Sequence, residues 1–207
     1  MVTFDCKIIF WDFDGVIKDS VKVKSVAFEQ LFSTFGKKFA KKVRVHHEKN
    51  GGVSRFIKIP KYLKWTEKKV TKPLIDEYTN LFSLLTKKKV IDSDWVKGVL
   101  SYLESNYNNK YFFLVTATPQ EEIDEIISSL KIKHFFQEII GAPTSKSDAI
   151  ARLLVEYSTH PEDAIMIGDS ISDYEAAVCN RVPFVLRCTD LNKELQKTKC
   201  IKIDNFE

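Results

Sequence analysis

Four short polar segments contain the residues of this chain that are best suited to chemistry. They are Asp12-Phe13-Asp14-Gly15, Thr116-Ala117-Thr118, Lys146 and Gly168-Asp169-Ser170-Ile171-Ser172-Asp173. Three of them follow apolar runs typical of buried parallel strands, at residues 8–11, 111–115 and 164–167. Ligands of open α/β sheets bind where such strands end, so we expect these segments to meet at one edge. Carboxylates and hydroxyls gathered there outline a magnesium and phosphate site.

Asp12 and Asp14 stand at the point where the chain is expected to turn, at Gly15. One carboxylate can attack phosphorus, which forms an aspartyl phosphate and divides hydrolysis into two easier steps. The other can protonate the leaving oxygen and then take a proton from the attacking water. An Asp-x-Asp-Gly sequence by itself is more often a solvated turn, so this prediction depends on the other segments.

Asp169 and Asp173 supply two further acids. Mg2+ prefers hard oxygen ligands and keeps several waters, so one direct carboxylate and one nearby carboxylate are a reasonable supply. Clustering several acids without a cation would be electrostatically costly. We therefore predict that Asp12, Asp169 and the backbone carbonyl of Asp14 hold Mg2+, with Asp173 nearby or orienting a water.

Thr116 and Ala117 precede a predicted helix in which Thr118 is the cap and Pro119 lies in the first turn. Unpaired N–H groups at a helix N-terminus attract phosphate, so Thr116 and the Ala117 amide are predicted to bind it. Lys146 is predicted to lie in a polar loop after a short strand, with its charge against the transferring phosphoryl oxygens. The competing interpretation of Lys146 is a solvated surface lysine.

A glycine turn, Gly51-Gly52, leads into a second candidate binding segment. Ser54 is a natural N-cap for the helix that follows, and Arg55 can clamp a phosphate or carboxylate with two hydrogen bonds. Both are predicted to bind substrate, and a plain surface arginine is the alternative for Arg55. The histidines, including His46 and His47, have no partner at a convincing spacing and receive no role.

The wider pattern predicts an α/β protein with a Rossmann-like parallel sheet. Apolar runs that suit strands alternate with amphipathic stretches that suit helices, which indicates helices on both faces of the sheet. Further strands are expected at residues 138–140, 183–186 and 200–203, the last at an edge. A helix rich in small residues is expected at 173–180.

Residues 18–94 contain helical patterns and no strong strand, which predicts a small helical cap inserted after the first strand. Phe28, Leu31 and Phe35 share a helix face that stops at Gly36, and the same kind of pattern recurs over residues 74–85. A helix containing Trp95 is expected to return the chain to the sheet. The predicted division is a catalytic core of residues 1–17 and 95–207 and a cap of residues 18–94.

Charge is distributed unevenly between these two parts. The formal net charge of the chain is +4, but residues 18–94 contain 19 Lys or Arg and 8 Asp or Glu, a net +11. The remaining residues carry a net −7. A basic cap that faces an acidic, metal-binding core favours an anionic substrate held between them.

The composition is ordinary for a soluble globular protein, with 44% hydrophobic and 29% charged residues. An early acid and the lack of a long apolar stretch exclude a secretory signal at the N-terminus, and no run approaches membrane-spanning length. The four cysteines form no Cys-x-x-Cys pair. Reduced thiols in a cytoplasmic protein are therefore expected.

With these residues in order, the chain resembles the haloacid dehalogenase superfamily, specifically its phosphatase branch with a helical cap after the first strand. The resemblance covers nearly the whole core, and the four motifs occur in sequence. It implies a Mg2+-dependent enzyme whose residues act as nucleophile (Asp12), acid/base (Asp14), phosphate ligand (Thr116), charge stabiliser (Lys146) and magnesium acids (Asp169 and Asp173). The second aspartate, Asp14, points away from the true dehalogenases, which do not need that arrangement.

The predicted function is hydrolysis of a small phosphorylated metabolite, a sugar phosphate or a phosphoglycolate-like acid, through an aspartyl phosphate. A mutase is the first alternative, because Gly52-Val53-Ser54-Arg55 is similar to the cap segment of β-phosphoglucomutases, where such an arginine contacts the distal phosphate of the substrate. Thr116-Ala117-Thr118 and Ser145-Lys146-Ser147 look closer to phosphatases of the phosphoglycolate and sugar-phosphate type. The resemblance therefore favours hydrolysis over transfer.

A nucleic-acid-binding protein is the alternative from a different class. Lysine runs such as Lys41-Lys42 and Lys87-Lys88-Lys89 would supply phosphate contacts with a steep salt dependence. These lysines are dispersed among helices with no recognised binding motif, so nucleic acid is the weaker prediction. The expected partner is a small phosphorylated substrate, no membrane association is expected, and the oligomeric state is left open.

Overall fold

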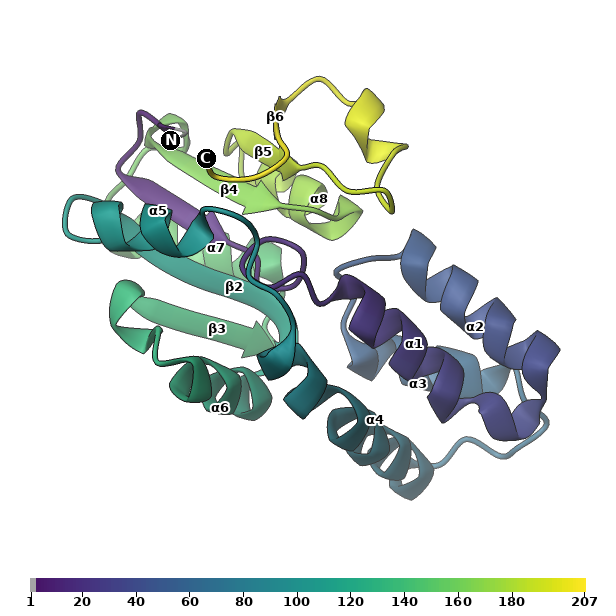
Figure 1. Cartoon of the computed structure of the whole chain (residues 1–207). Coiled ribbons are helices and arrows are strands. Elements are labelled where there is room, and N and C mark those ends of the chain that lie inside the picture. The colour runs from purple at the N-terminus through teal and green to yellow at the C-terminus, as the bar shows by residue number, and fades with distance from the viewer. Residues whose placement is uncertain (1–2) are drawn as a thin grey trace.

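A computed structural model describes residues 3–207 of the chain (Figure 1). Its centre is a parallel sheet with the strand order β3-β2-β1-β4-β5-β6. The strands are β1 (Ile8–Trp11), β2 (Tyr111–Pro119), β3 (Glu138–Ala142), β4 (Ala164–Gly168), β5 (Phe184–Arg187) and β6 (Ile201–Ile203). Because β1 lies between β2 and β4, the segments that follow these three strands meet at one edge of the sheet.

Helices cover both faces of the sheet, as predicted. They are α5 (Val99–Asn106), α6 (Gln120–Leu130), α7 (Lys146–Glu156) and α8 (Ile171–Cys179). Alternate residues of β1 point to opposite faces: Ile9 and Trp11 pack with α5 and α6, whereas Ile8 and Phe10 pack with α7 and α8. Every residue of β1 is buried, which explains its unbroken apolar sequence.

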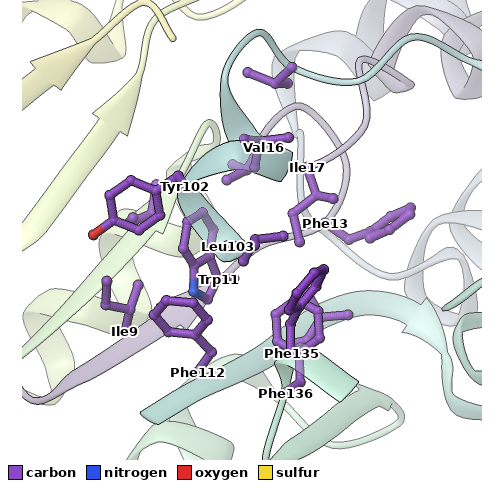
Figure 2. Close-up of a cluster of buried hydrophobic side chains, with 14 of the residues drawn as sticks. Ile9, Trp11, Phe13, Val16, Ile17, Tyr102, Leu103, Phe112, Phe135 and Phe136 are labelled. Carbon is purple, nitrogen blue, oxygen red and sulfur yellow. The ribbon is translucent and has the colours of Figure 1, made fainter. Parts of the chain in front are cut away.

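Trp11 is the largest side chain of the first of these two cores, and it directly precedes Asp12 (Figure 2). Its ring centroid lies 5.6 Å from that of Tyr102 and 5.4 Å from that of Phe112, both in edge-on contact. Phe206 lies at 5.4 Å, so the last residues of the chain also pack against it. These contacts fix the end of β1 and thereby the position from which Asp12 projects.

The helical cap inserted after the first strand is confirmed. It consists of α1 (Val21–Leu31), α2 (Lys37–Lys49), α3 (Arg55–Lys64) and α4 (Lys72–Asp92), which lie together to one side of the sheet (Figure 1). These helices bury an apolar cluster of their own, which includes Phe28, Tyr62 and Phe82. The two connections between cap and core run side by side, because Lys18 forms a backbone bridge with Trp95 and its ammonium lies 4.3 Å from the Trp95 ring centroid.

One predicted boundary was wrong in a way that matters for the site. Strand β2 extends to Pro119, so Thr116 and Ala117 lie within a strand and not at a helix N-terminus. Thr118 does not cap α6, whose N-cap is Pro119 without a side-chain hydrogen bond. Pairing of Pro119 with Ala142 of β3, after an irregularity in the register, carries the strand past the predicted stop.

Smaller differences concern element ends. Trp95 precedes α5 and belongs to the bridge with Lys18, and Gly36 ends a short 3-10 turn (Ser33–Phe35) that follows α1. Lys146 is the first residue of α7 and does not lie in a loop, because Ser145 caps that helix. The predicted edge strand is present as β6. Within residues 3–207, no helix combines the length and the apolarity needed to cross a bilayer.

Trp11→Ala is expected to lower the free energy of unfolding by about 3–5 kcal/mol, because a fully buried aromatic side chain leaves a cavity. Urea denaturation followed by circular dichroism measures the change. Leu84→Ala, at a side chain that is 80% exposed on α4, should stay within about 0.5 kcal/mol. Equal losses in the two variants would show that Trp11 does not anchor the core.

Candidate active site

Three carboxylates converge at the edge of the sheet where β1 and β4 end. Asp12 follows β1, Asp169 follows β4, and Asp173 lies in the first turn of α8. Oxygen atoms of these three side chains lie within 4.8 Å of one another, and all three residues are buried. An oxygen-only set of this kind suits a hard cation such as Mg2+. The structure thus brings together the three acids that the sequence indicated.

The electrostatics of this cluster also fit a cation. Burial, followed by repulsion from Asp173, raises the pKa of Asp12 to about 7. Burial, followed by the charges of Asp12 and Asp173, raises the pKa of Asp169 well above its ordinary value. Buried carboxylates that resist ionisation are stabilised as anions when a positive charge is placed among them. The residues present therefore fit a divalent cation.

Lys146 is the positive charge that the protein itself supplies to the cluster. Its ammonium lies 2.8 Å from Asp12 Oδ1 and also hydrogen-bonds to Asp173 Oδ1. Burial by itself would lower the pKa of Lys146, but Asp12 and Asp173 outweigh it and hold the pKa above its usual range. Lys146 is therefore a permanent cation beside the predicted nucleophile.

Asp173 is held by the protein on both of its oxygens. Oδ1 contacts Lys146, while Oδ2 accepts hydrogen bonds from Ser170 N at 3.0 Å and from Ser170 Oγ at 2.6 Å. The bond from Ser170 N belongs to the capping box that starts α8. Asp173 is thus fixed at a place close to Asp12 and Asp169, in keeping with the auxiliary position predicted for it.

Asp14 lies apart from this cluster and contacts a cap residue that sequence reasoning missed. Its Oδ1 accepts a hydrogen bond from Ser20 Oγ at 2.6 Å, and its Oδ2 pairs with the ammonium of Lys24 on α1. Thr118 Oγ1 donates to Asp14 Oδ2 at 3.3 Å and accepts from Lys24 at 2.8 Å. Burial alone would raise the pKa of Asp14, but Lys24 and Ser20 lower it overall. The carboxylate form of Asp14 is therefore favoured.

Lys24 and Thr118 left little signal in the sequence. Residues 18–94 contain 19 Lys or Arg, and nothing in the spacing distinguishes Lys24 from the others. Thr118 has an obvious local explanation as a helix cap, which concealed its contact with Asp14. Thr116 keeps its predicted place beside the acids, and its Oγ1 accepts a hydrogen bond from Thr118 N at 3.2 Å.

A small cavity lies between the cap and the core, in front of these residues. Its volume is about 60 Å³. The core contributes Asp12, Asp14, Thr116, Ala117 and Asp169; the cap contributes Val21, Lys24, Phe28, His47, Gly51, Gly52, Val53, Arg55, Lys58 and Phe82. Acids line one side, and basic and apolar groups line the other. The structure therefore places a cavity between the predicted nucleophile and the basic cap.

The cap is closed over this cavity by the glycine turn. A Cβ atom on Gly52 would lie 1.9 Å from Ser172 Oγ and 2.3 Å from Ser170 Oγ, so the turn touches the N-terminal end of α8. The φ angle of Gly52 is also positive, at +73°. Only glycine permits this close approach of the cap to the first turn of α8.

The side chains of Arg55 and Ser54 both have partners within the protein. Ser54 is the N-cap that was predicted, and binding of substrate by the two residues stays a prediction. Arg55 lines the cavity, but its guanidinium forms a bidentate pair with Glu122 of α6, at 2.7 and 2.6 Å, and also bonds to Ser83 at 2.7 Å. Burial by itself would raise the pKa of Glu122, but Arg55 and Ser83 lower it. Ser54 is not among the lining residues, and its hydroxyl caps α3 by accepting from Phe56 N. In this closed arrangement Arg55 joins cap to core.

Glu122→Gln is expected to lower the free energy of unfolding by about 3–5 kcal/mol, because it leaves the Arg55 charge buried without a counter-ion. Glu125→Gln is the matched control, since Glu125 of the same helix, α6, pairs with Lys87 of the cap helix α4, but in solvent. Its effect should be below about 1 kcal/mol. Chemical denaturation measures both variants, and similar values for the two would contradict a buried connection between cap and core.

Gly15→Ala is expected to weaken Mg2+ binding at least about tenfold, because its Cβ atom would lie 2.2 Å from Asp169 Oδ2 and displace that carboxylate. Gly36→Ala controls for backbone strain, since Gly36 also has a positive φ but no atom within 4 Å of the new Cβ. Calorimetric titration with Mg2+ compares the two variants with the unaltered protein. Unchanged affinity in Gly15→Ala would remove Asp169 from the metal site.

Comparison with known proteins agrees with this geometry. The sequence model of the haloacid dehalogenase-like hydrolases matches residues 8–186. A phosphoglycolate phosphatase from Vibrio cholerae is 27% identical over 184 residues, which cover 83% of this chain and 79% of that protein.

Solved structures share the fold. The β-phosphoglucomutase of Clostridium difficile superposes with a TM-score of 0.73 at 21% identity, covering 97% of this chain and 92% of that one. CbbY from Rhodobacter sphaeroides, solved with phosphate, gives a TM-score of 0.73 at 15% identity, over 97% and 95% of the two chains. The family match spans most of the chain and both strands that carry the acids. The chain belongs to the haloacid dehalogenase-like hydrolases.

Proposed function

We propose that the protein is a Mg2+-dependent phosphatase that hydrolyses a small phosphorylated metabolite through an aspartyl phosphate on Asp12. The observation that carries the proposal is the position of Asp12, which is buried at the end of β1, contacts Lys146 and opens onto the cavity under the cap. A carboxylate placed beside a fixed cation can approach a phosphate dianion that it would otherwise repel.

In the first half of the reaction, a carboxylate oxygen of Asp12 attacks phosphorus and the bond to the leaving oxygen breaks. Lys146 stays charged beside Asp12 and opposes the negative charge of the phosphoryl oxygens. Thr116 and Ala117 line the same space and hold the phosphoryl group. Mg2+ bound by Asp12, Asp169 and the Asp14 carbonyl would neutralise further charge on these oxygens.

Asp14 handles the proton. The leaving oxygen takes a proton from the Asp14 carboxyl, and in the second half Asp14 accepts a proton from the water that attacks the aspartyl phosphate. Lys24 favours the charged form of Asp14 in the closed, empty cavity. Protonated Asp14 therefore requires that Lys24 turn away from it, and an incoming phosphate dianion is the competing partner for that ammonium.

The cap closes the reaction off from water, and it must open to admit substrate. A volume of about 60 Å³ leaves little room beyond a small anion. The contact of Gly52 with the loop at Ser170 and the pair between Arg55 and Glu122 both have to separate for entry. We propose that residues 18–94 are the moving unit and that the bridge between Lys18 and Trp95 lies at its hinge.

The pairing of Arg55 supports hydrolysis over the mutase alternative. The mutase prediction depended on Arg55 as the ligand of a distal phosphate, and here its charge is neutralised by Glu122. Phosphoglycolate, the substrate in the name of the Vibrio cholerae relative, is small enough to be the first compound to test.

Purified protein is expected to release inorganic phosphate from phosphoglycolate or another small phosphate monoester, with Mg2+ and not with EDTA. Asp12→Asn should lower kcat about a thousandfold or more, because the nucleophile is lost. Asp5→Asn, an exposed acid ahead of β1, is the control and should not change the rate. Interconversion of sugar phosphates without phosphate release would favour the mutase, and full activity in Asp12→Asn would contradict the nucleophile assignment.

A further inference from the structure

Lys58 is a buried cation in the cavity that the sequence did not single out. It lies on α3 and is only 2% exposed. Its ammonium is 3.0 Å from Nδ1 of His47 on α2, and both residues line the cavity. Together they form part of the cap side of the space whose core side is made by Asp12, Thr116 and Asp169. Lys58 is thus positioned to meet whatever is attached to the phosphoryl group.

Lys58 differs from the other cations of the cavity in having no acidic partner. Lys24 is paired with Asp14, and Arg55 is paired with Glu122. Within residues 3–207, no carboxylate forms a salt bridge with Lys58. The ammonium of Lys58 is removed from water and hydrogen-bonds to an imidazole. The charge of Asp14 acts on it favourably, but Lys58 lacks the direct ion pair that ordinarily compensates a buried charge.

The energetics of this position favour an incoming anion. Burial, followed by the charge of Lys24, lowers the pKa of Lys58 to about 7. Burial and the charge of Lys58 lower the pKa of His47 well below its ordinary value, so His47 is neutral. A negative group that enters the cavity would stabilise the charged form of Lys58 and replace the water that it lost. The pair is therefore costly when the cavity is empty and compensated when an anion fills it.

The size of the cavity limits what that anion can be. A cavity volume of about 10–15 Å³ is enough to hold one water molecule. The volume of about 60 Å³ between the acids and the cap therefore accommodates short groups. A carboxylate one or two carbons from the phosphate ester fits this limit better than a second phosphate does.

We propose that Lys58, supported by His47, is the specificity-determining contact for a carboxylate on the leaving group of the substrate. The proposal rests on the phosphatase function above and assigns the distal contact to Lys58 in place of Arg55. It predicts a preference for short phosphorylated carboxylic acids over neutral phosphate esters of the same size.

Binding of stable analogues tests the contact without turnover. In the presence of Mg2+, calorimetric titration should show that phosphonoacetate binds at least about tenfold more tightly than 2-hydroxyethylphosphonate, which replaces the carboxylate by a neutral alcohol. This comparison needs no variant. Equal affinities, or no binding of either compound, would overturn the proposal. Tighter binding of methylenebisphosphonate than of phosphonoacetate would overturn the assignment to a carboxylate.

Lys58→Met should remove the preference for phosphonoacetate and leave the affinity for 2-hydroxyethylphosphonate within about threefold. Lys61→Met, at an exposed lysine on the same helix, should retain the preference. Melting temperature separates a folding defect from a lost contact, and Lys58→Met should melt no lower than the unaltered protein, because it removes an uncompensated buried charge. Retention of the preference by a folded Lys58→Met protein would refute the role of Lys58.

Hydrolysis of phosphoglycolate and of 2-hydroxyethyl phosphate separates this proposal from the one on which it rests. The unaltered protein should favour phosphoglycolate in kcat/KM at least about tenfold, and Lys58→Met should lose that ratio. If both esters are hydrolysed equally well, the phosphatase function stands and the Lys58 contact is wrong. If neither is hydrolysed but phosphonoacetate is still bound preferentially, the contact stands and the phosphatase function is wrong.

Discussion

Repulsion among three buried carboxylates is the constraint on which the architecture of the site depends. Asp12, Asp169 and Asp173 have oxygens within 4.8 Å of one another, and without compensation they would resist ionisation or move apart. Two features hold them in place. The parallel pairing of β1 with β4 fixes the backbone from which Asp12 and Asp169 project, and Lys146 places its ammonium between Asp12 and Asp173. A divalent cation would complete the neutralisation. Its binding would relieve the repulsion among the carboxylates, which increases the affinity of the site for the metal and for phosphate.

The cap completes this site and does more than cover it. Lys24 of α1 binds Asp14, the turn at Gly52 touches the N-terminal end of α8, and Arg55 of α3 pairs with Glu122 of α6. Each contact joins an element of the cap to an element of the core. Opening of the cap, as proposed, would therefore break charge pairs as well as packing, and the first of these pairs involves Asp14, the proposed acid/base residue. Cap position and the protonation of Asp14 are coupled in the proposed mechanism for this reason.

Under the proposed function, the cavity is also a place where stability is exchanged for recognition. A fold optimised for stability alone would place an apolar side chain at the position of Lys58. A buried ammonium that contacts His47 and forms no ion pair with a carboxylate is unfavourable for folding. The aromatic cluster around Trp11 and the apolar cluster of the cap supply the stability that tolerates such a group. The charge of Arg55, by contrast, is compensated within the protein by Glu122. Such a pair suits a contact that holds the cap and the core together.

The core of this protein was readable from sequence because its signals are local. An apolar strand followed at once by Asp12, Thr116 or Asp169 defines both the element and the edge at which the side chain lies, so the fold class, the helical cap and the convergence of the acids were predicted correctly. The end of β2 was not predicted correctly, because the pairing of β2 with β3 extends the strand beyond the local capping signal at Thr118. The partners of the long basic side chains were decided only by tertiary structure: Arg55 meets an acid 67 positions away, and Lys24 meets a threonine 94 positions away. The segment contains 19 basic residues with flexible side chains, and the sequence pattern does not predict which of them pairs with which acid. The packing of the cap against the core determines these pairs.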